Sequence, residues 1–306
     1  MDENGLGPLL GPLVVTGVAL DISCERLEPL KNLSADIPSI RDSKKVFSQR
    51  SLKKGESLAL ALIGIINGAV PASLRDLLAA LHCEATGSFP FPCHTGETEQ
   101  FCMAENPSLP LWCEPGDVER VGEELGHGLK EAGLGRSCIV SAAWCPWALN
   151  RKVSEGTNKF DLDLQTFLRI TRVFQELYSK PVDVVAGKVG SRVYYADAIE
   201  GFFGKQPEIL AQAGVESAYR LGSDVRLRFV MDADDKYMHV SMASIVGKYL
   251  REVFMEAIYR YAQRGFGEKL RRPSGYRDPV TKEFVRITEG FLSDCGVSPA
   301  CVKRSR

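Results

Sequence analysis

The chain has 306 residues, with 38 Lys and Arg against 39 Asp and Glu, so its formal net charge is −1. This balance excludes a uniformly basic nucleic-acid coat and an acidic solvating tail. Hydrophobic residues make up 44% and charged residues 25%, which is typical of a folded globule and not of a disordered chain. A chain of this length can bury a large core without disulfide staples.

Export and membrane signals are absent from the sequence. The longest apolar stretch, Leu58 to Val70, is interrupted by Gly64, Asn67 and Gly68, and it is too short to span a bilayer. The first residues lack a basic segment before an apolar run, so we expect no signal peptide. Nine cysteines is an odd number, which favours reduced thiols or metal ligands over a disulfide framework. We therefore expect a cytoplasmic protein that does not enter a membrane.

Apolar patterning predicts a strand and then a helix in the first quarter of the chain. A Gly- and Pro-rich loop precedes the valine-rich strand Leu13 to Leu20, and Ser51 to Ile66 has helical spacing. Residues 66–133 differ, because an amphipathic segment, Ser73 to Leu81, is followed by a Pro- and Cys-rich loop, Cys83 to Cys113, and by a second helix. We interpret residues 66–133 as an insertion.

The second half of the chain returns to alternating elements. Strands are predicted at Ser137 to Ala143, Val182 to Val185 and Arg226 to Met231, and helices at Phe160 to Leu177 and Ser244 to Tyr261. Strands interleaved with helices are typical of an α/β fold.

Acidic residues stand beside separate apolar segments. Asp2 and Glu3 precede the Gly-Pro loop, and Asp232 and Asp234 follow the strand that ends at Met231. If that strand continues through Asp234, its two aspartates share one face, because strand side chains alternate. Clustered carboxylates repel one another, and a hard cation such as Mg²⁺ or Mn²⁺ relieves that repulsion. The alternative is that these acids are solvated residues at strand ends.

Four motifs resemble those of the ribonuclease HII family, in that family's order. They are the segment Asp2 to Pro12, the loop Arg41-Asp42-Ser43-Lys44-Lys45, the segment Asp232 to Lys248, and Gly275-Tyr276 with Asp278-Pro279. Asn158, before the predicted Phe160 helix, fits a further landmark. The resemblance implies a ribonuclease H-like fold with a central mixed sheet flanked by helices. It also implies a catalytic domain over residues 1–270, interrupted by the helical and Cys-rich insertion, and a C-terminal segment over 271–306 that carries the Gly-Tyr motif.

The resemblance further implies metal-dependent endonucleolytic cleavage of RNA in RNA–DNA hybrids, or of duplex DNA at an embedded ribonucleotide. It assigns Asp2, Glu3 and Asp234 to three of the four acids that hold Mg²⁺ or Mn²⁺ and carry out catalysis. Such clusters suit phosphodiester hydrolysis, because metal ions activate water and stabilise the leaving oxygen.

Substrate contacts are implied at five further positions. Lys44 and Lys45 fall where the family contacts phosphate, which suits ammonium point charges. Backbone N–H groups of Gly5 and Gly7 are expected to face the substrate. Tyr276 falls where the family contacts the sugar at the RNA–DNA junction, where the 2′-hydroxyl distinguishes RNA from DNA.

Several positions depart from the family's pattern. Ala186 stands where the fourth acid is expected, and Asp232, at a position where the family has lysine, is predicted to supply the missing metal-binding carboxylate. Lys188 is predicted to take the place of one metal ion or to bind the scissile phosphate, and the alternative is a solvated loop lysine. Leu6 replaces an arginine and cannot donate to phosphate. An apolar half-strand precedes the family's first acids, and without it we expect Asp2 and Glu3 to lie on a fraying terminus.

A zinc site is a further hypothesis for the insertion. Its loop holds four cysteines and one histidine that could bind Zn²⁺: Cys83, Cys93, His94, Cys102 and Cys113. Their spacing lacks the paired Cys-x-x-Cys pattern, and the alternative is that the thiols are free.

The sequence thus predicts a monomeric, divergent ribonuclease HII-like endonuclease. The second hypothesis is a pseudo-nuclease that binds hybrid or structured nucleic acid without cutting it, which Ala186 and Leu6 favour. The third is a protein-interaction module created by the insertion.

Overall fold

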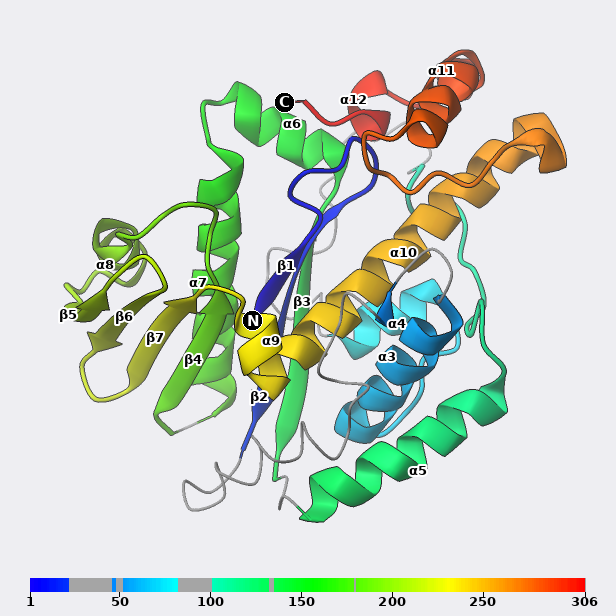
Figure 1. Ribbon diagram of the computed structural model, residues 1–306. Coiled ribbons are helices and arrows are strands. Elements are labelled where there is room, and N and C mark those ends of the chain that lie inside the picture. Colours follow the sequence, from blue (N-terminus) through cyan, green and yellow to red (C-terminus); the bar gives the residue numbers. More distant parts are fainter. Residues whose placement is uncertain (22–45, 48–51, 82–100, 132–134, 179, 306) are drawn as a thin grey trace.

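The computed structural model describes residues 1–21, 46–47, 52–81, 101–131, 135–178 and 180–305 (Figure 1). Two sheets lie at the centre of these residues. The first is antiparallel, with strand order β1 (Asp2–Asn4), β2 (Leu13–Leu20), β3 (Ser137–Trp144). The second has the order β4 (Val182–Gly187), β7 (Val225–Val230), β6 (Glu216–Leu221), β5 (Glu208–Gln212). In it β4 and β7 are parallel, and the other neighbouring pairs are antiparallel.

Met1 joins the two sheets edge to edge. Its amino nitrogen donates to the Val185 carbonyl at 2.6 Å, and the Gly187 N–H donates to the Met1 carbonyl at 3.1 Å. These bonds bracket Ala186 as in a parallel bridge, so β1 lies beside β4. The predicted central mixed sheet is therefore confirmed. The expectation of a fraying terminus is wrong, because hydrogen bonds to β2 and β4 fix β1 on both of its edges.

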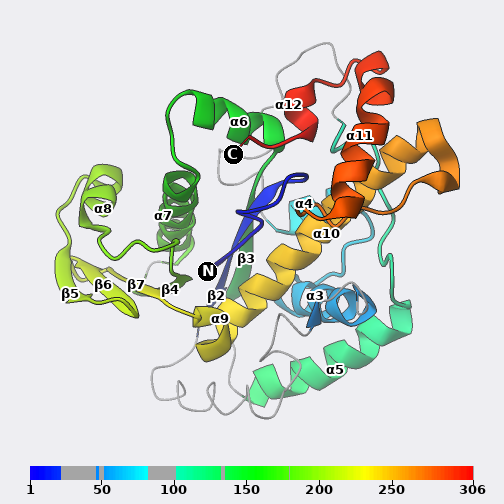
Figure 2. The same ribbon diagram turned by 45° about the horizontal axis from the view of Figure 1, so that its top comes forward.

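Helices α10 (Met238–Phe266) and α7 (Lys159–Leu177) cover opposite faces of the β1–β2–β3 sheet (Figure 2). A Cβ atom added at Gly247 of α10 would lie 2.5 Å from Asn4 Nδ2, so only glycine permits this close approach of helix and sheet. On the other face, a Cβ atom added at Gly17 of β2 would lie 2.7 Å from Ile170 of α7. The sheet is buried on both sides, which explains its valine-rich strands.

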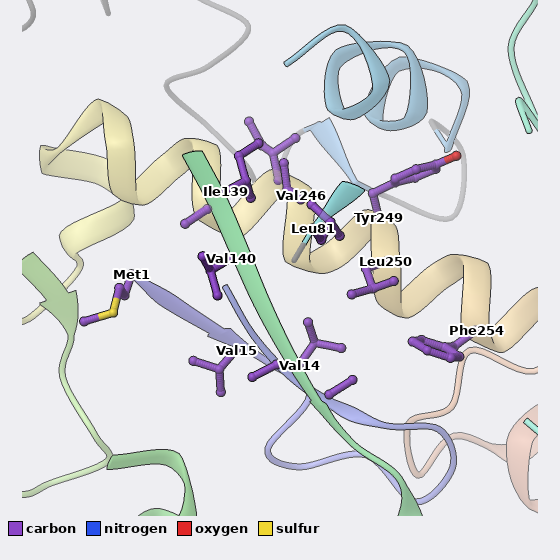
Figure 3. Packing of buried hydrophobic residues seen from close by; sticks show 14 of the residues in the cluster. Met1, Val14, Val15, Leu81, Ile139, Val140, Val246, Tyr249, Leu250 and Phe254 are labelled. Carbon is purple, nitrogen blue, oxygen red and sulfur yellow. The ribbon is translucent and has the colours of Figure 1, made fainter. Parts of the chain in front are cut away.

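The main core includes both faces of the first sheet (Figure 3). Val14 and Ile139 lie on the face covered by Val246, Leu250 and Phe254 of α10, and Val15 and Val140 lie on the face covered by α7; all of these side chains are buried. Each such side chain contributes roughly 1.5–3 kcal/mol relative to an exposed one. This packing fixes α10 across β1, where the predicted acids lie.

The segment interpreted as an insertion, residues 66–133, contains α4 (Leu74–Ala80) and α5 (Pro115–Glu131), and α5 packs against α3 (Leu52–Asn67). Ser73 caps α4 by accepting from the Asp76 N–H. The Glu56 carboxylate of α3 has no accessible surface and accepts the N–H groups of Leu111, Trp112 and Cys113. It therefore fixes the end of the loop before α5 onto α3. In the described residues, no helix combines the length and apolar character needed to cross a bilayer.

The remaining helices were not predicted. They are α6 (Pro146–Ser154), α8 (Ala196–Phe203), α9 (Ala233–Lys236), η2 (Gly267–Lys269), α11 (Pro279–Asp294) and α12 (Pro299–Val302). The C-terminal helices lie at one end of the molecule, where α11 contacts α10 and α12 contacts α6. The predicted strands and long helices correspond to β2, β3, β4, β7, α3, α7 and α10. Most ends shift by one or two residues, but α10 begins six residues before the predicted helix and ends five residues after it.

Candidate functional site

Asp2 and Glu3 face opposite sides of the sheet. Cross-strand pairs share a face and successive residues alternate, so Asp2 lies with Thr16 and Glu3 lies with Val15. Thr16 belongs to the face covered by α10. Glu3 accordingly faces the side covered by α7.

On the α10 side, Asp2 is grouped with residues of α9 and α10. Burial raises the pKa of Asp2, and the nearby negative charge of Asp234 raises it further. A hydrogen bond from the Ser244 side chain and the charge of Lys248 oppose this rise. The structure thus brings Asp2 and Asp234 within electrostatic range of each other, beside a lysine ammonium.

The predicted strand through Asp234 is wrong. Strand β7 ends at Val230, Asp232 has a left-handed backbone with φ 53°, and Asp234 lies in helix α9. Asp232 and Asp234 therefore share no strand face. Asp232 is exposed and Asp234 is half-buried, and the αL residue starts a turn that directs Asp234 back toward β1.

On the α7 side, Glu3 is grouped with a carboxylate that the sequence analysis missed. Burial, and next the charge of Asp2, raise the pKa of Glu3 to about 7, although the Leu6 N–H and the charge of Arg304 lower it. Asp163 of α7 has no accessible surface. Burial raises the pKa of Asp163 well above its ordinary value, and Glu3 and Asp2 add to this rise.

A sequence signal for Asp163 exists. It stands four residues before Phe167 and begins the buried row Asp163, Phe167, Ile170, Phe174, which has the spacing of one helix face. A carboxylate in an apolar row is unusual, because a buried charge needs a partner. The apolar residues alone predict the buried face of this helix, so Asp163 was missed.

The chemistry of these acids fits a hard divalent cation. Glu3 Oε2 and both Asp163 carboxylate oxygens are buried without a hydrogen-bond partner, and carboxylate oxygens are the ligands that Mg²⁺ and Mn²⁺ prefer. Over the described ranges, no three His, Cys, Asp or Glu side chains are arranged to hold one ion as they stand. Uncompensated carboxylates repel one another, so binding requires these side chains to turn toward a shared centre.

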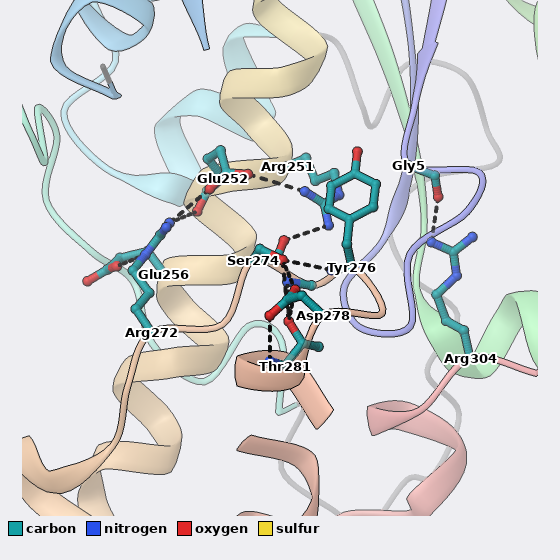
Figure 4. A network of polar contacts seen from close by, with 11 residues as sticks. Gly5, Arg251, Glu252, Glu256, Arg272, Ser274, Tyr276, Asp278, Thr281 and Arg304 are labelled. Atoms are coloured by element: carbon teal, nitrogen blue, oxygen red, sulfur yellow. Dashed lines mark hydrogen bonds and ion pairs between the residues drawn. The ribbon is translucent and has the colours of Figure 1, made fainter. Parts of the chain in front are cut away.

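The Gly-Tyr segment lies beside the Gly-Pro loop (Figure 4). The N–H groups of Leu9 and Leu10 both donate to the Gly275 carbonyl, at 2.8 and 3.0 Å. The Tyr276 side chain is 52% exposed, and the Arg251 guanidinium lies 4.9 Å from its ring centre. Tyr276 is thus held at the surface with one ring face supported, which leaves it available to contact a ligand.

A buried arginine near the end of the chain holds the loop after β1. Arg304, 1% exposed, donates to the carbonyls of Gly5 and Leu6 at 2.5 and 3.1 Å (Figure 4). Gly7, two residues on, is exposed. The loop that carries the predicted glycines is therefore tied to the C-terminal segment.

The predicted lysines are placed differently. The Lys188 ammonium donates to the Gly214 carbonyl at 2.6 Å, in the turn between β5 and β6. The lysine whose charge acts on Asp2 and Glu3 is Lys248 of α10. Lys44 and Lys45 lie outside the described residues.

The zinc hypothesis is only partly covered by the structure. Cys83, Cys93 and His94 lie outside the described residues. Cys102 and Cys113 are buried and form no disulfide, and burial raises the pKa of Cys113 to about 12. Zinc binding in this loop stays a prediction.

Comparison with known proteins gives the fold. No protein-family model and no curated protein matches the sequence. A chain of the PCNA–RNase HII complex from Archaeoglobus fulgidus aligns with 100% of this chain and 92% of its own length, at 19% identity and a TM-score of 0.50. Ribonuclease H2 from Pyrococcus horikoshii OT3 aligns with 98% of this chain and 89% of its own length, at 18% identity and a TM-score of 0.46. The first likeness shows that the chain has the ribonuclease H-like fold found in ribonuclease HII.

Proposed function

We propose that the protein is a divergent ribonuclease HII-like endonuclease. It hydrolyses RNA in RNA–DNA hybrids, or duplex DNA at an embedded ribonucleotide, with Mg²⁺ or Mn²⁺. The observation that carries this proposal is that Asp2 of β1, followed by Glu3, lies within electrostatic range of Asp234 of α9 on a ribonuclease H-like fold. These residues come from opposite ends of the sequence, and their mutual repulsion disfavours the grouping unless a cation compensates it.

In this proposal the acids hold the cation and the lysines and Tyr276 hold the substrate. A divalent cation bound there polarises the phosphodiester and makes water a better nucleophile. Asp2 and Asp234 face it from the α10 side and Glu3 from the α7 side, and exposed Asp232 adds negative charge nearby. The Tyr276 ring packs on the sugar, and its hydroxyl contacts the 2′-hydroxyl of the ribonucleotide.

Phosphate contacts come from the remaining predicted residues. The exposed N–H of Gly7, with Lys44 and Lys45, suits phosphate binding without sequence preference. Lys188 can serve this role only by leaving the Gly214 carbonyl, because its ammonium is engaged there. The cytoplasmic location and the monomeric state stay predictions from the sequence.

The second candidate is a protein that binds such duplexes without cutting them. Two observations favour it. Position 186, at the end of β4, is alanine, and within the described part of the chain no three ligands are arranged around one point. Binding would then depend on Tyr276 and the basic residues alone.

One assay separates the two candidates. A labelled duplex with a single embedded ribonucleotide is incubated with Mg²⁺ and then with Mn²⁺, and an all-DNA duplex of the same sequence is the control. We expect a cut 5′ to the ribonucleotide, a loss of at least about 100-fold in Asp234→Asn, and no change in the neighbouring exposed variant Asp235→Asn. Binding without cutting supports the second candidate. If the protein neither binds nor cuts the duplex, both candidates are wrong.

A further inference from the structure

Asp163 is a buried carboxylate without a partner. Both of its oxygens are inaccessible, and neither accepts a hydrogen bond. The acid two residues earlier on the same helix, Asp161, pairs with Arg192. Because a buried polar group without a partner costs folding free energy, such groups usually mark a missing ligand or a catalytic role.

The side chain at position 186, where the family has an acid and this chain has alanine, lies on the sheet face that α7 covers. Asp163 lies on α7 and approaches the sheet from this same side. The two hydrogen bonds of Met1 bracket Ala186, so these two residues share a face. Glu3 follows two residues after Met1 along β1 and lies on that face as well. Helix α7, which carries Asp163, packs against both β4 and β2 on this side.

The charges around Asp163 also favour a bound cation. Among the groups whose charge acts on Asp163, the two largest are the carboxylates of Glu3 and Asp2, both of which are repulsive. Glu3 in turn has one buried oxygen without a partner. Asp163 of α7 and Glu3 of β1, whose Oε2 has no partner, repel each other, and a cation between them compensates this repulsion best.

We propose that Asp163 is the fourth carboxylate of the cation site and takes the place of the acid absent at Ala186. The proposal rests on the proposed function for the other three acids, Asp2, Glu3 and Asp234. The fourth ligand then comes from helix α7 instead of from the end of β4, and it completes the site from the same face. This arrangement explains why a carboxylate stands in the apolar row of α7.

Direct metal binding tests this assignment without relying on catalysis. Free Mn²⁺ is titrated by electron paramagnetic resonance into the wild type and into Asp163→Asn, Asp163→Leu and Asp161→Asn. We expect at least about a 10-fold weaker Mn²⁺ affinity in both Asp163 variants. The Asp161 variant is the matched control, because it removes an acid from the same helix, and its Mn²⁺ affinity should equal that of the wild type.

Metal-free stability separates a ligand from a structural residue. In excess EDTA, Asp163→Leu should melt at the same or a higher temperature than the wild type, because an unpartnered buried acid is replaced by an apolar group. A structural acid would give a lower melting temperature and unchanged Mn²⁺ affinity. That result, or failure of both Asp163 variants to fold, overturns the assignment, as does a wild type that does not bind Mn²⁺.

A second-site variant provides the rescue. Ala186→Asp in the Asp163→Asn background returns a carboxylate to the same face and should restore Mn²⁺ affinity to within about threefold of the wild type. If Mn²⁺ affinity does not increase in this double variant, the side chains at positions 163 and 186 do not reach the same cation site. The duplex assay keeps the two proposals apart, because Asp163-dependent Mn²⁺ binding without cutting contradicts only the nuclease function. Cutting with unchanged Mn²⁺ binding in Asp163→Asn contradicts only the role of Asp163.

Discussion

Glu56 and Asp163 are both acids without accessible surface, and the molecule treats them in opposite ways. Glu56 accepts three backbone N–H groups from the loop before α5 and the Tyr249 hydroxyl. Asp163 accepts no hydrogen bond, and the charges of two further carboxylates, Glu3 and Asp2, repel it. Burial alone therefore does not tell how a carboxylate is stabilised. The donors around it do, because a carboxylate that accepts hydrogen bonds holds its surroundings together, whereas one that accepts none is costly to bury.

The largest expected effect on stability comes from substituting Glu56, the acid whose hydrogen bonds are made. Glu56→Gln keeps the volume of the side chain but places an amide NH₂ among backbone N–H donors. We expect the free energy of unfolding to fall by about 3 kcal/mol, because buried donors lose their acceptor. Urea unfolding measures this loss, with the exposed Glu123→Gln of α5 as a control that should stay within about 0.5 kcal/mol of the wild type. A Glu56 variant as stable as its control would show that the hydrogen bonds to Glu56 do not stabilise the fold, and would remove the contrast with Asp163.

The next effect is the pH dependence of stability that Glu3 causes within the acidic cluster of Asp2, Glu3 and Asp163. The pKa of Glu3 is about 7 in the folded protein, against an ordinary value of 4.5, so the folded state binds this proton more tightly than the unfolded state. Its contribution to stability is fully present below about pH 4.5 and is lost as the pH rises to about 7, by at most about 3 kcal/mol. In EDTA, Glu3→Gln should match the wild type at pH 4.5 and exceed its stability at pH 8.

Urea unfolding at the two pH values provides this measurement. The gain at pH 8 should disappear when saturating Mn²⁺ is added, because the ion stabilises only the protein that keeps the carboxylate. A wild type whose metal-free stability increases from pH 4.5 to pH 8 through Glu3 would mean that the carboxylate has a partner after all.

A smaller effect is expected at Arg304, which partly compensates the cluster. Arg304→Met removes the donor to the Gly5 and Leu6 carbonyls. We expect a loss of about 2 kcal/mol in urea unfolding. Because the charge of Arg304 lowers the pKa of Glu3, the pH transition of metal-free stability should also move upward. Arg286→Met, an exposed arginine of α11, should change neither quantity, and an unchanged pH transition in Arg304→Met would separate Arg304 from the cluster.

The sequence predicted the elements whose pattern is set by burial on a regular surface. The valine run of β2 and the helical spacing of α7 and α10 agree with the structure, because periodic apolar residues determine these elements directly. Asp2 and Glu3 were expected on a fraying terminus, since no apolar half-strand precedes them in the sequence. Strand β1 forms through pairing with β2 and β4, which no local signal reveals.

The motifs assigned Asp2, Glu3 and Asp234 to the candidate site, and in the structure Asp2 and Asp234 lie within electrostatic range of each other. That these residues hold a cation stays a prediction. The face assigned to Asp232 was wrong because a single αL residue ends the strand. Asp163 was missed because its importance depends on which face of β1 the helix covers. Helix α11 had an unused signal, since Asp278 and Pro279 form an N-cap and a first helical position.

The smallest expected effect tests how completely Glu56 is satisfied. Tyr249→Phe removes one of its four donors and leaves the three backbone N–H groups in place. Because the substitution removes the hydroxyl itself, it leaves no unpaired polar group at position 249. We expect a loss of about 1 kcal/mol in urea unfolding, the typical net value of one hydrogen bond. A loss as large as that of Glu56→Gln would mean that the hydroxyl, and not the loop backbone, stabilises this buried charge.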